Sequence, residues 1–178
     1  MTLMKRMMLM VVLLLAVVAS ACEKIDDLLT FYIEEEETFT IESGFPLGAL
    51  IPATPFTITT NSEETFKNNK TRAELVKNVS LNRLELTIAA PKNQNFDFLK
   101  RIELYISSEK QPEVKIAYLD EVPAGSNVLK LKSTNAKLDE YIKGDNYTIR
   151  TKAEISKPVT EDITIKADMR FKVTADPL

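Results

Sequence analysis

The segments YTIRTKAEI (residues 147–155) and ITIKADMRFKV (residues 163–173) carry the strongest structural signal in this 178-residue chain. In each of them, apolar or small side chains alternate with polar or charged ones. A period of two is typical of a β-strand with one buried and one solvated face. Residues 156–162, which include Pro158, interrupt the alternation and predict a connection. We therefore expect a long antiparallel hairpin with one dry face, near the centre of the fold.

The same alternation recurs in shorter segments toward the N-terminus. Residues 43–55 contain three prolines and two glycines and predict a loop, and residues 61–71 predict a loop or a short helical turn. The chain is expected to hold eight or nine strands, most with a single apolar face. The further strands are predicted around residues 29–33, 39–41, 56–58, 84–90, 102–106, 114–118 and 129–131.

One short helix is predicted, from Asn135 to Lys143, with Thr134 or Asn135 as its N-cap. Its apolar residues fall at positions i, i+3 and i+4 and would form one stripe that faces the core. These residues are Leu138, Tyr141 and Ile142.

The order of the predicted elements favours an all-β fold. Because strands do not alternate with helices, a parallel sheet is not expected. Strands with one apolar face are best satisfied by two antiparallel sheets packed face to face. We predict a single two-sheet antiparallel sandwich over residues 28–178, immunoglobulin-like or a jelly roll, with a closed β-barrel as the alternative.

A run of four glutamates, Glu34 to Glu37, interrupts the first predicted strand. It predicts two short strands, or one strand whose middle leaves the sheet. A solvated edge that discourages pairing with other chains explains the run. The alternative is Ca²⁺ binding through carboxylate oxygens, although at most two of the four side chains can share a face of a strand.

The composition excludes several classes of site. The chain has no His and no Trp, and Cys22 is its one cysteine. The commonest general base, imidazole and thiolate metal ligands and an intrachain disulfide are therefore missing. Asp139, Glu140 and Asp145 flank the predicted helix and could meet as catalytic carboxylates, but helix capping and a turn already explain them. We expect no catalytic residues, no metal and no cofactor.

The N-terminal residues have a different character from the rest. Lys5 and Arg6 precede an uninterrupted apolar run, residues 7–19, which is too short for a comfortable membrane span of about 20 residues. Small residues follow, and Cys22 comes directly after them. A positive start, a short apolar core and small residues are typical of an export signal.

Residues 1–22 resemble the lipobox of bacterial lipoproteins. That resemblance implies a signal peptide of residues 1–21 removed by signal peptidase II, a diacylglycerol on Cys22, and residues 22–27 as a lipidated tether. Ala19 stands where the family prefers Leu, and Ala19-Ser20-Ala21 would also serve ordinary secretion. The acidic tether and the sandwich together resemble uncharacterised β-sandwich lipoproteins of the Bacteroidota, a resemblance that brings no activity with it.

Without residues 1–21, the chain holds 21 Lys and Arg against 26 Asp and Glu, a formal charge of −5. This balance predicts no nucleic-acid partner. Residues 23–27 resemble the acidic signals that send some lipoproteins to the cell surface. We expect a lipid-anchored protein of the cell envelope, at the outer membrane, that binds an envelope protein or a glycan without catalysis. The alternative is a small carbohydrate-active protein or other hydrolase that uses acidic residues.

Overall fold

The computed structural model describes residues 30–44 and 50–175; the predicted signal peptide, Cys22 and the whole predicted tether lie outside them. The described residues form two short α-helices, α2 (Ser62–Asn68) and α3 (Asp139–Ile142), where one was predicted, and two 3₁₀ helices, η1 (Ala73–Leu75) and η2 (Phe96–Phe98). None of their helices is long and apolar enough to cross a membrane. The strands are β1 (Thr30–Ile41), β2 (Leu50–Thr59), β3 (Val76–Ala90), β4 (Leu99–Ser107), β5 (Val114–Leu119), β6 (Val128–Lys130), β7 (Lys132–Ser133), β8 (Asn146–Ile155) and β9 (Ile163–Ala175).

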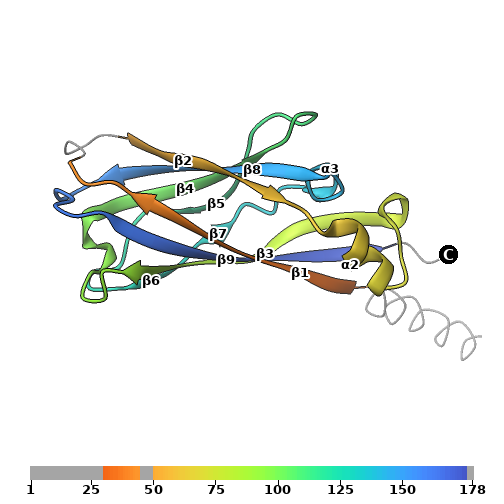
Figure 1. Ribbon diagram of the computed structural model, residues 1–178, viewed down its shortest axis with the longest axis horizontal. Coiled ribbons are helices and arrows are strands. Elements are labelled where there is room, and N and C mark those ends of the chain that lie inside the picture. Colours follow the sequence, from red (N-terminus) through yellow and green to blue (C-terminus); the bar gives the residue numbers. More distant parts are fainter. Residues whose placement is uncertain (1–29, 45–49, 176–178) are drawn as a thin grey trace, which may run out of the picture.

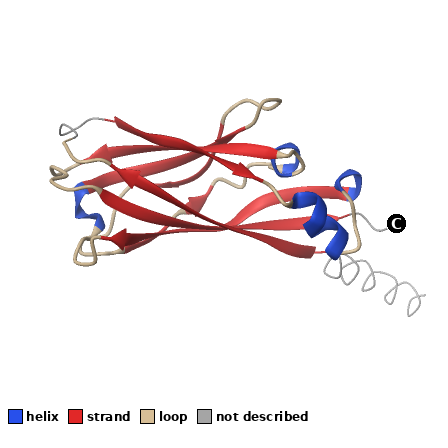
Figure 2. Cartoon of the chain, viewed as in Figure 1, coloured by secondary structure: helices blue, strands red, loops and turns tan. Residues whose placement is uncertain are grey.

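The strands form two layers, which confirms the predicted antiparallel sandwich (Figure 1). One sheet has the order β1-β9-β3-β6 and the other the order β2-β8-β4-β5-β7. Strands cover almost the whole length of the molecule, and the short helices lie at its ends (Figure 2). Each sheet keeps two edge strands among the described residues, so the closed-barrel alternative is wrong.

The pairing of the strands is nested. β1 pairs with β9, β2 with β8, β3 with β6 and β4 with β5, all antiparallel. The chain is therefore one long antiparallel ribbon that has been rolled up, and the β3–β9 and β4–β8 pairs close the roll into sheets. This is the jelly-roll arrangement, one of the two sandwich types predicted.

The predicted hairpin of residues 147–173 is wrong, although both of its strands exist. β8 lies in one sheet and β9 in the other, so the two strands face each other across the core. The ring of Tyr147 on β8 meets the ring of Phe171 on β9 edge to face, with centroids 6.1 Å apart. Alternation shows which face of a strand is buried, but it does not show which strand is its hydrogen-bonded neighbour. Two strands can bury their apolar faces against each other from opposite sheets as well as side by side in one sheet.

The dry faces themselves are confirmed. Every second residue of β9 from Ile163 to Ala175, and of β8 from Tyr147 to Ile155, is at most 4% exposed. Burying one large apolar side chain of this kind contributes roughly 1.5–3 kcal/mol. These two strands therefore supply the middle of the core from both layers.

Two other segments differ from their predictions. Half of the predicted loop 43–55 belongs to β2, which tolerates Pro52 and Pro55 because it is an edge strand with a bulge between Ala53 and Phe56. β1 runs without a break through Glu34 to Glu37, since pairing with β9 continues at every residue. The solvated-edge interpretation fits its place at the edge of its sheet.

Helix α3 is shorter than predicted. Its stripe of Leu138, Tyr141 and Ile142 is buried as expected, but the helix begins only at Asp139. Asn135 has a left-handed backbone (φ +57°), and the hydroxyl of Thr134 donates to the carbonyl of Lys115 instead of capping the helix. Thr134 is therefore held by strand β5 and the backbone at Asn135 is not helical, so the helix cannot begin at either residue.

Candidate functional site

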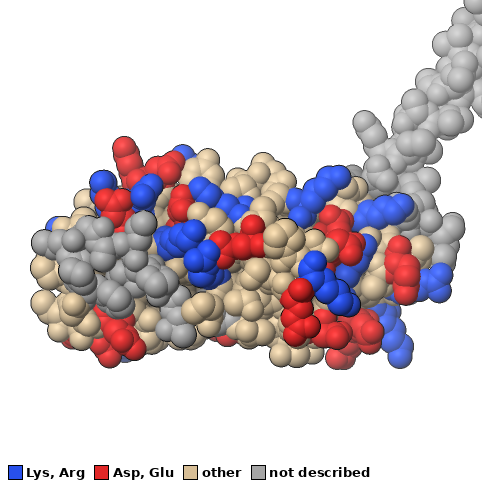
Figure 3. Space-filling view, turned by 90° about the horizontal axis from the view of Figure 1, so that it is seen from above, with Lys and Arg blue, Asp and Glu red and all other residues tan. Residues whose placement is uncertain are grey.

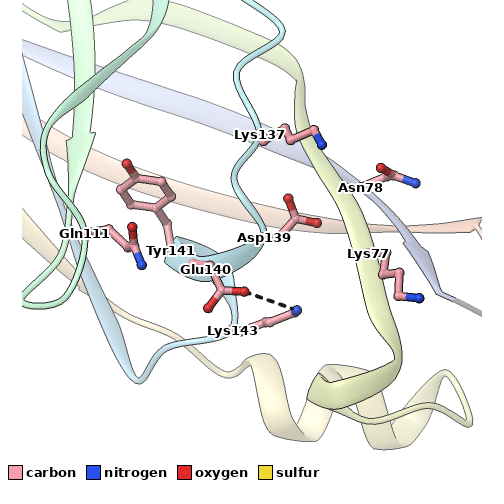
Figure 4. A pocket seen from close by; sticks show the side chains of 8 residues that line it. All are labelled: Lys77, Asn78, Gln111, Lys137, Asp139, Glu140, Tyr141 and Lys143. Carbon is pink, nitrogen blue, oxygen red and sulfur yellow. Dashed lines mark hydrogen bonds and ion pairs between the residues drawn. The ribbon is translucent and has the colours of Figure 1, made fainter.

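A hollow of about 500 Å³ lies beside α3 and contains two of the acidic residues predicted as catalytic candidates. Figure 4 shows the side chains around it. They come from the start of β3, from α3 and the residues that flank it, and from the turn before β5. The lining residues are Lys77, Asn78, Gln111, Lys137, Asp139, Glu140, Tyr141 and Lys143.

One backbone and one side-chain hydrogen bond fix α3 against its neighbours and so shape the hollow. The Leu138 N–H donates to the Val79 carbonyl on β3 (2.9 Å). The Tyr141 hydroxyl donates to the Pro112 carbonyl in the turn before β5 (2.7 Å). Because Leu138 and Tyr141 are also buried, this short helix is a rigid wall of the site.

The two acidic side chains of the hollow are already engaged. The carboxylate of Asp139 accepts a hydrogen bond from the Val79 N–H (3.1 Å) and holds α3 to β3. The carboxylate of Glu140 lies 3.5 Å from the ammonium group of Lys143. Both carboxylates therefore have structural partners, but neither caps the helix, so the predicted capping role is wrong.

Asp145 does not join them. It lies in a second hollow of about 310 Å³ between the end of β2 and the start of α2, and its carbonyl accepts a hydrogen bond from the Thr60 N–H (2.9 Å). Lys143 lines both hollows and stands between Asp145 and the pair on α3. The structure thus brings together two of the three predicted acids and leaves the third apart.

Three lysines surround the first hollow, and sequence reasoning missed them. Lys77 lies on β3, Lys137 precedes α3 and Lys143 follows it (Figure 4). Ammonium groups are compact positive charges that bind phosphate and carboxylate groups. The amides of Asn78 and Gln111 beside them can donate to and accept from hydroxyl groups. Lys137 and Lys143 flank one helix, but no spacing in the sequence connects them with Lys77 on β3.

This hollow lies at the end of the molecule where the described chain begins. Thr30 pairs with Thr174, and Thr174 also pairs with Lys77, so these residues form one row across β1, β9 and β3. With about 4.8 Å between strands, the backbones of Thr30 and Lys77 are roughly 10 Å apart. Figure 1 shows α2, α3 and the start of β1 at this same end.

The outer face of the five-stranded sheet carries a second cluster of charged and aromatic side chains. The Tyr105 ring has the Lys152 ammonium 4.2 Å from its centroid and the Arg150 guanidinium at 5.7 Å. Lys115 and Tyr105 both donate to Glu103, and these hydrogen bonds lower the pKa of its carboxyl. Glu113 pairs with Arg150 and Lys152 in the same cluster, so these charges have partners within it and do not point to a ligand.

Charges of both signs are mixed over the molecule. The face drawn in Figure 3 interleaves Lys and Arg with Asp and Glu along its length. Among the described residues, Tyr32 is the one large hydrophobic side chain that is exposed, and the Arg170 guanidinium covers its ring at 3.8 Å. The described surface therefore offers neither a concave cluster of exposed aromatic rings nor a flat apolar patch.

Comparisons with known proteins give a fold likeness only. No family model matches the chain, and no curated protein matches it. Among solved structures, it is similar to the decameric capsid protein of BFDV, with a TM-score of 0.42, 11% identity and coverage of 83% of this chain and 98% of that one. The structure of infectious bursal disease virus strain Gt matches with a TM-score of 0.37 and 12% identity, over 82% of this chain and 32% of that one. The structure of turnip yellow mosaic virus at 100 K matches with a TM-score of 0.28 and 10% identity, over 83% of this chain and 95% of that one. Likenesses of this size carry no conclusion about activity or partners.

Proposed function

We propose that this protein is a lipid-anchored binding module of the cell envelope, held at the outer membrane through Cys22, and that it works without catalysis. Its ligand is an anionic envelope glycan bound at the hollow beside α3. One observation carries the proposal: three lysines and two carboxylates line this hollow, and the carboxylates are engaged by the Val79 N–H and by one of the lysines, Lys143, so positive charge is in excess there.

The place of the hollow agrees with an anchor at Cys22. Thr30 is eight residues after Cys22, and an extended chain of that length spans at most about 28 Å. The lysine hollow would then lie close to the membrane surface, where phosphate and carboxylate groups are frequent. Two acyl chains give stable anchoring, because each buried CH₂ contributes roughly 0.8 kcal/mol.

A charged glycan fits the chemistry of the lining better than a neutral one. The ammonium groups pair with carboxylate or phosphate, and Asn78 and Gln111 can bind sugar hydroxyls. Exposed ion pairs contribute only about 0.2–1 kcal/mol each, so a single site would bind weakly. A repeating polymer compensates, since many anchored copies bind it at once.

Binding of the purified domain to acidic and neutral polysaccharides tests this function. We expect binding to the acidic polymer that weakens with added salt, because exposed charges are screened. The double variant Lys77→Ala/Lys137→Ala should lose most of it. The control is Lys92→Ala, an exposed lysine just beyond β3, far from the row that contains Lys77. Equal binding by all variants, or capture of a protein in place of the polymer, would contradict the glycan assignment.

Catalysis is the competing function, and the same protein tests it. Turnover of a glycan or ester that is lost in Asp139→Asn or Asp145→Asn would overturn the non-catalytic part of the proposal. Asp139→Asn keeps an oxygen that can accept from the Val79 N–H, so the fold should survive the change.

Exposure at the cell surface is a separate part of the proposal, motivated by the acidic residues 23–27. Protease treatment of intact cells should degrade the native protein, and the variant Asp26→Ala/Asp27→Ala should be protected. Complete protection of the native protein would place the domain on an inner-facing leaflet.

A further inference from the structure

Two of the four consecutive glutamates on β1 face the inside of the sandwich. Glu35 and Glu37 lie opposite Met169 and Ala167 of β9, and both partners are buried. Each of the two glutamates is only partly exposed, with the buried Ile33 and Phe39 on the same face of the strand. Two partly buried carboxylates therefore lie close together on the inward face of β1.

No described cation compensates them. The basic side chains near this strand pair with the outward glutamates: Arg83 and Arg170 with Glu34, and Lys166 with Glu36. Within the described residues, neither Glu35 nor Glu37 has an ion-pair partner. Burial, and then the negative charge of Glu37, raise the pKa of Glu35. The pair is therefore electrostatically unfavourable as it stands.

A third oxygen faces the same interior from the other sheet. Tyr147 on β8 is 1% exposed, and its hydroxyl is buried without a hydrogen-bond partner among the described residues. Buried phenol hydroxyls normally have a partner, so an orphan points to a missing water or ion. The Tyr147 ring contacts Phe171, which lies opposite Ile33 on the inward face of β1, two residues from Glu35. Burial, and then the charges of Glu35 and Glu37, raise the pKa of Tyr147.

We propose that Glu35 and Glu37 bind a calcium ion at the β1 side of the sandwich, with the Tyr147 hydroxyl facing the ion from the opposite sheet. Two carboxylates neutralise a divalent charge, and oxygen is the ligand that hard cations prefer. Because the carboxylates are partly exposed, water can complete the coordination. Calcium accepts such an irregular set, whereas Mg²⁺ demands a near-ideal octahedron.

The proposed site is small, which sets its affinity. No group of three or more acidic, His or Cys side chains that could hold a metal occurs in the described part of the chain. Two charged ligands therefore predict a dissociation constant in the range of extracellular modules, about 10⁻⁴–10⁻³ M. Such a site would be filled outside the cytoplasm, and it would tie β1 to the opposite layer. This inference is independent of the glycan assignment.

Thermal unfolding of the purified mature domain in calcium and in chelator tests the site. We expect the Tm to rise with calcium up to about 10 mM and to fall back with chelator, because a ligand of the folded state stabilises it by mass action. Glu35→Gln/Glu37→Gln should abolish the shift. The matched control Glu34→Gln/Glu36→Gln, on the outward face of the same strand, should retain it. Absence of a shift in the native protein, an equal loss in both variants, or an equal shift with Mg²⁺ would overturn the proposal.

Terbium luminescence tests the part of Tyr147. Terbium replaces calcium at oxygen sites and is excited through a nearby tyrosine ring, so the native domain should give tyrosine-sensitised emission that calcium quenches. Tyr147→Phe should reduce the emission several-fold, and Tyr32→Phe, on the outward face, should not. Emission that is unchanged in Tyr147→Phe would remove this residue from the site.

Discussion

The two outward glutamates of β1 and the two inward ones come from a single run of four identical residues, yet they lie in opposite environments. Glu34 and Glu36 belong to a ladder of ion pairs on the solvated face of the sheet. Glu35 and Glu37 face the interior beside Met169 and Ala167, without an ion pair among the described residues. The difference arises from the period of the strand alone, because successive side chains point to opposite faces.

This comparison shows that residue type and sequence position do not decide what a charge does. The outward pair stabilises the sheet edge modestly and keeps it soluble. The inward pair costs stability unless something neutralises it. A polar residue kept in an unfavourable position is therefore a sign of a ligand, whereas the same residue one position away is ordinary surface.

The largest expected difference between an inward and an outward position is on β9, the strand that pairs with β1. Phe171→Asp would place an unpaired charge in the core against Tyr147, and we expect a loss of roughly 4 kcal/mol or more in the free energy of unfolding. Lys172→Asp, one position further and exposed, should change it by less than about 0.5 kcal/mol. Urea unfolding of both variants measures the difference, and similar losses would mean that the two faces of β9 are wrongly assigned.

A smaller effect distinguishes the two pairs of glutamates directly. In chelator, Glu35→Gln/Glu37→Gln should raise the free energy of unfolding, because it removes like charges from a partly buried position. Glu34→Gln/Glu36→Gln should lower it by about 0.2–1 kcal/mol per ion pair lost. Chemical unfolding of the two double variants checks the signs. Two changes of the same sign would contradict the inward and outward assignment.

The smallest expected effect concerns a carboxylate on the other sheet. The hydrogen bond from Lys115 and that from Tyr105 hold the pKa of Glu103 below its ordinary value. Ionised Glu103 therefore stabilises the folded protein fully above the pKa of about 4.3 that it has in the unfolded chain. This stabilisation is lost as the pH falls through the lowered pKa of the folded state. In Glu103→Gln, the free energy of unfolding should fall less steeply as the pH is lowered below about 4.3 than in the native protein. The exposed Glu109→Gln is the control and should behave like the native protein. The same acid dependence in Glu103→Gln as in the native protein would show that these hydrogen bonds do not persist in solution.

The sequence predicts the strands of this fold better than their partners. Local alternation identified β8 and β9 with their dry faces, because burial acts on each strand separately. It failed on their pairing, since the rolled ribbon places β8 and β9 in opposite sheets. The sequence also wrongly predicted a loop around Pro52 and Pro55, because an edge strand such as β2 can contain prolines.

The candidate site was predicted only in part, for a related reason. Asp139 and Glu140 were recognised because they are neighbours on one short helix. Lys77 and Lys137 come together only when β3 packs against α3, and Tyr147 and Glu35 belong to different sheets. Contacts between segments far apart in the chain leave no periodic trace in the sequence, so such sites require the structure.

Where the domain works depends on Cys22, and fatty-acid labelling tests that claim most directly. Cells that express the native protein or Cys22→Ser are grown with a labelled fatty acid, fractionated, and compared for label and membrane content. We predict a labelled native protein in the membrane fraction, and an unlabelled Cys22→Ser that remains an uncleaved precursor or becomes soluble. A Cys22→Ser protein with undiminished label and the native membrane distribution would contradict the lipid anchor and, with it, the proposed place of action.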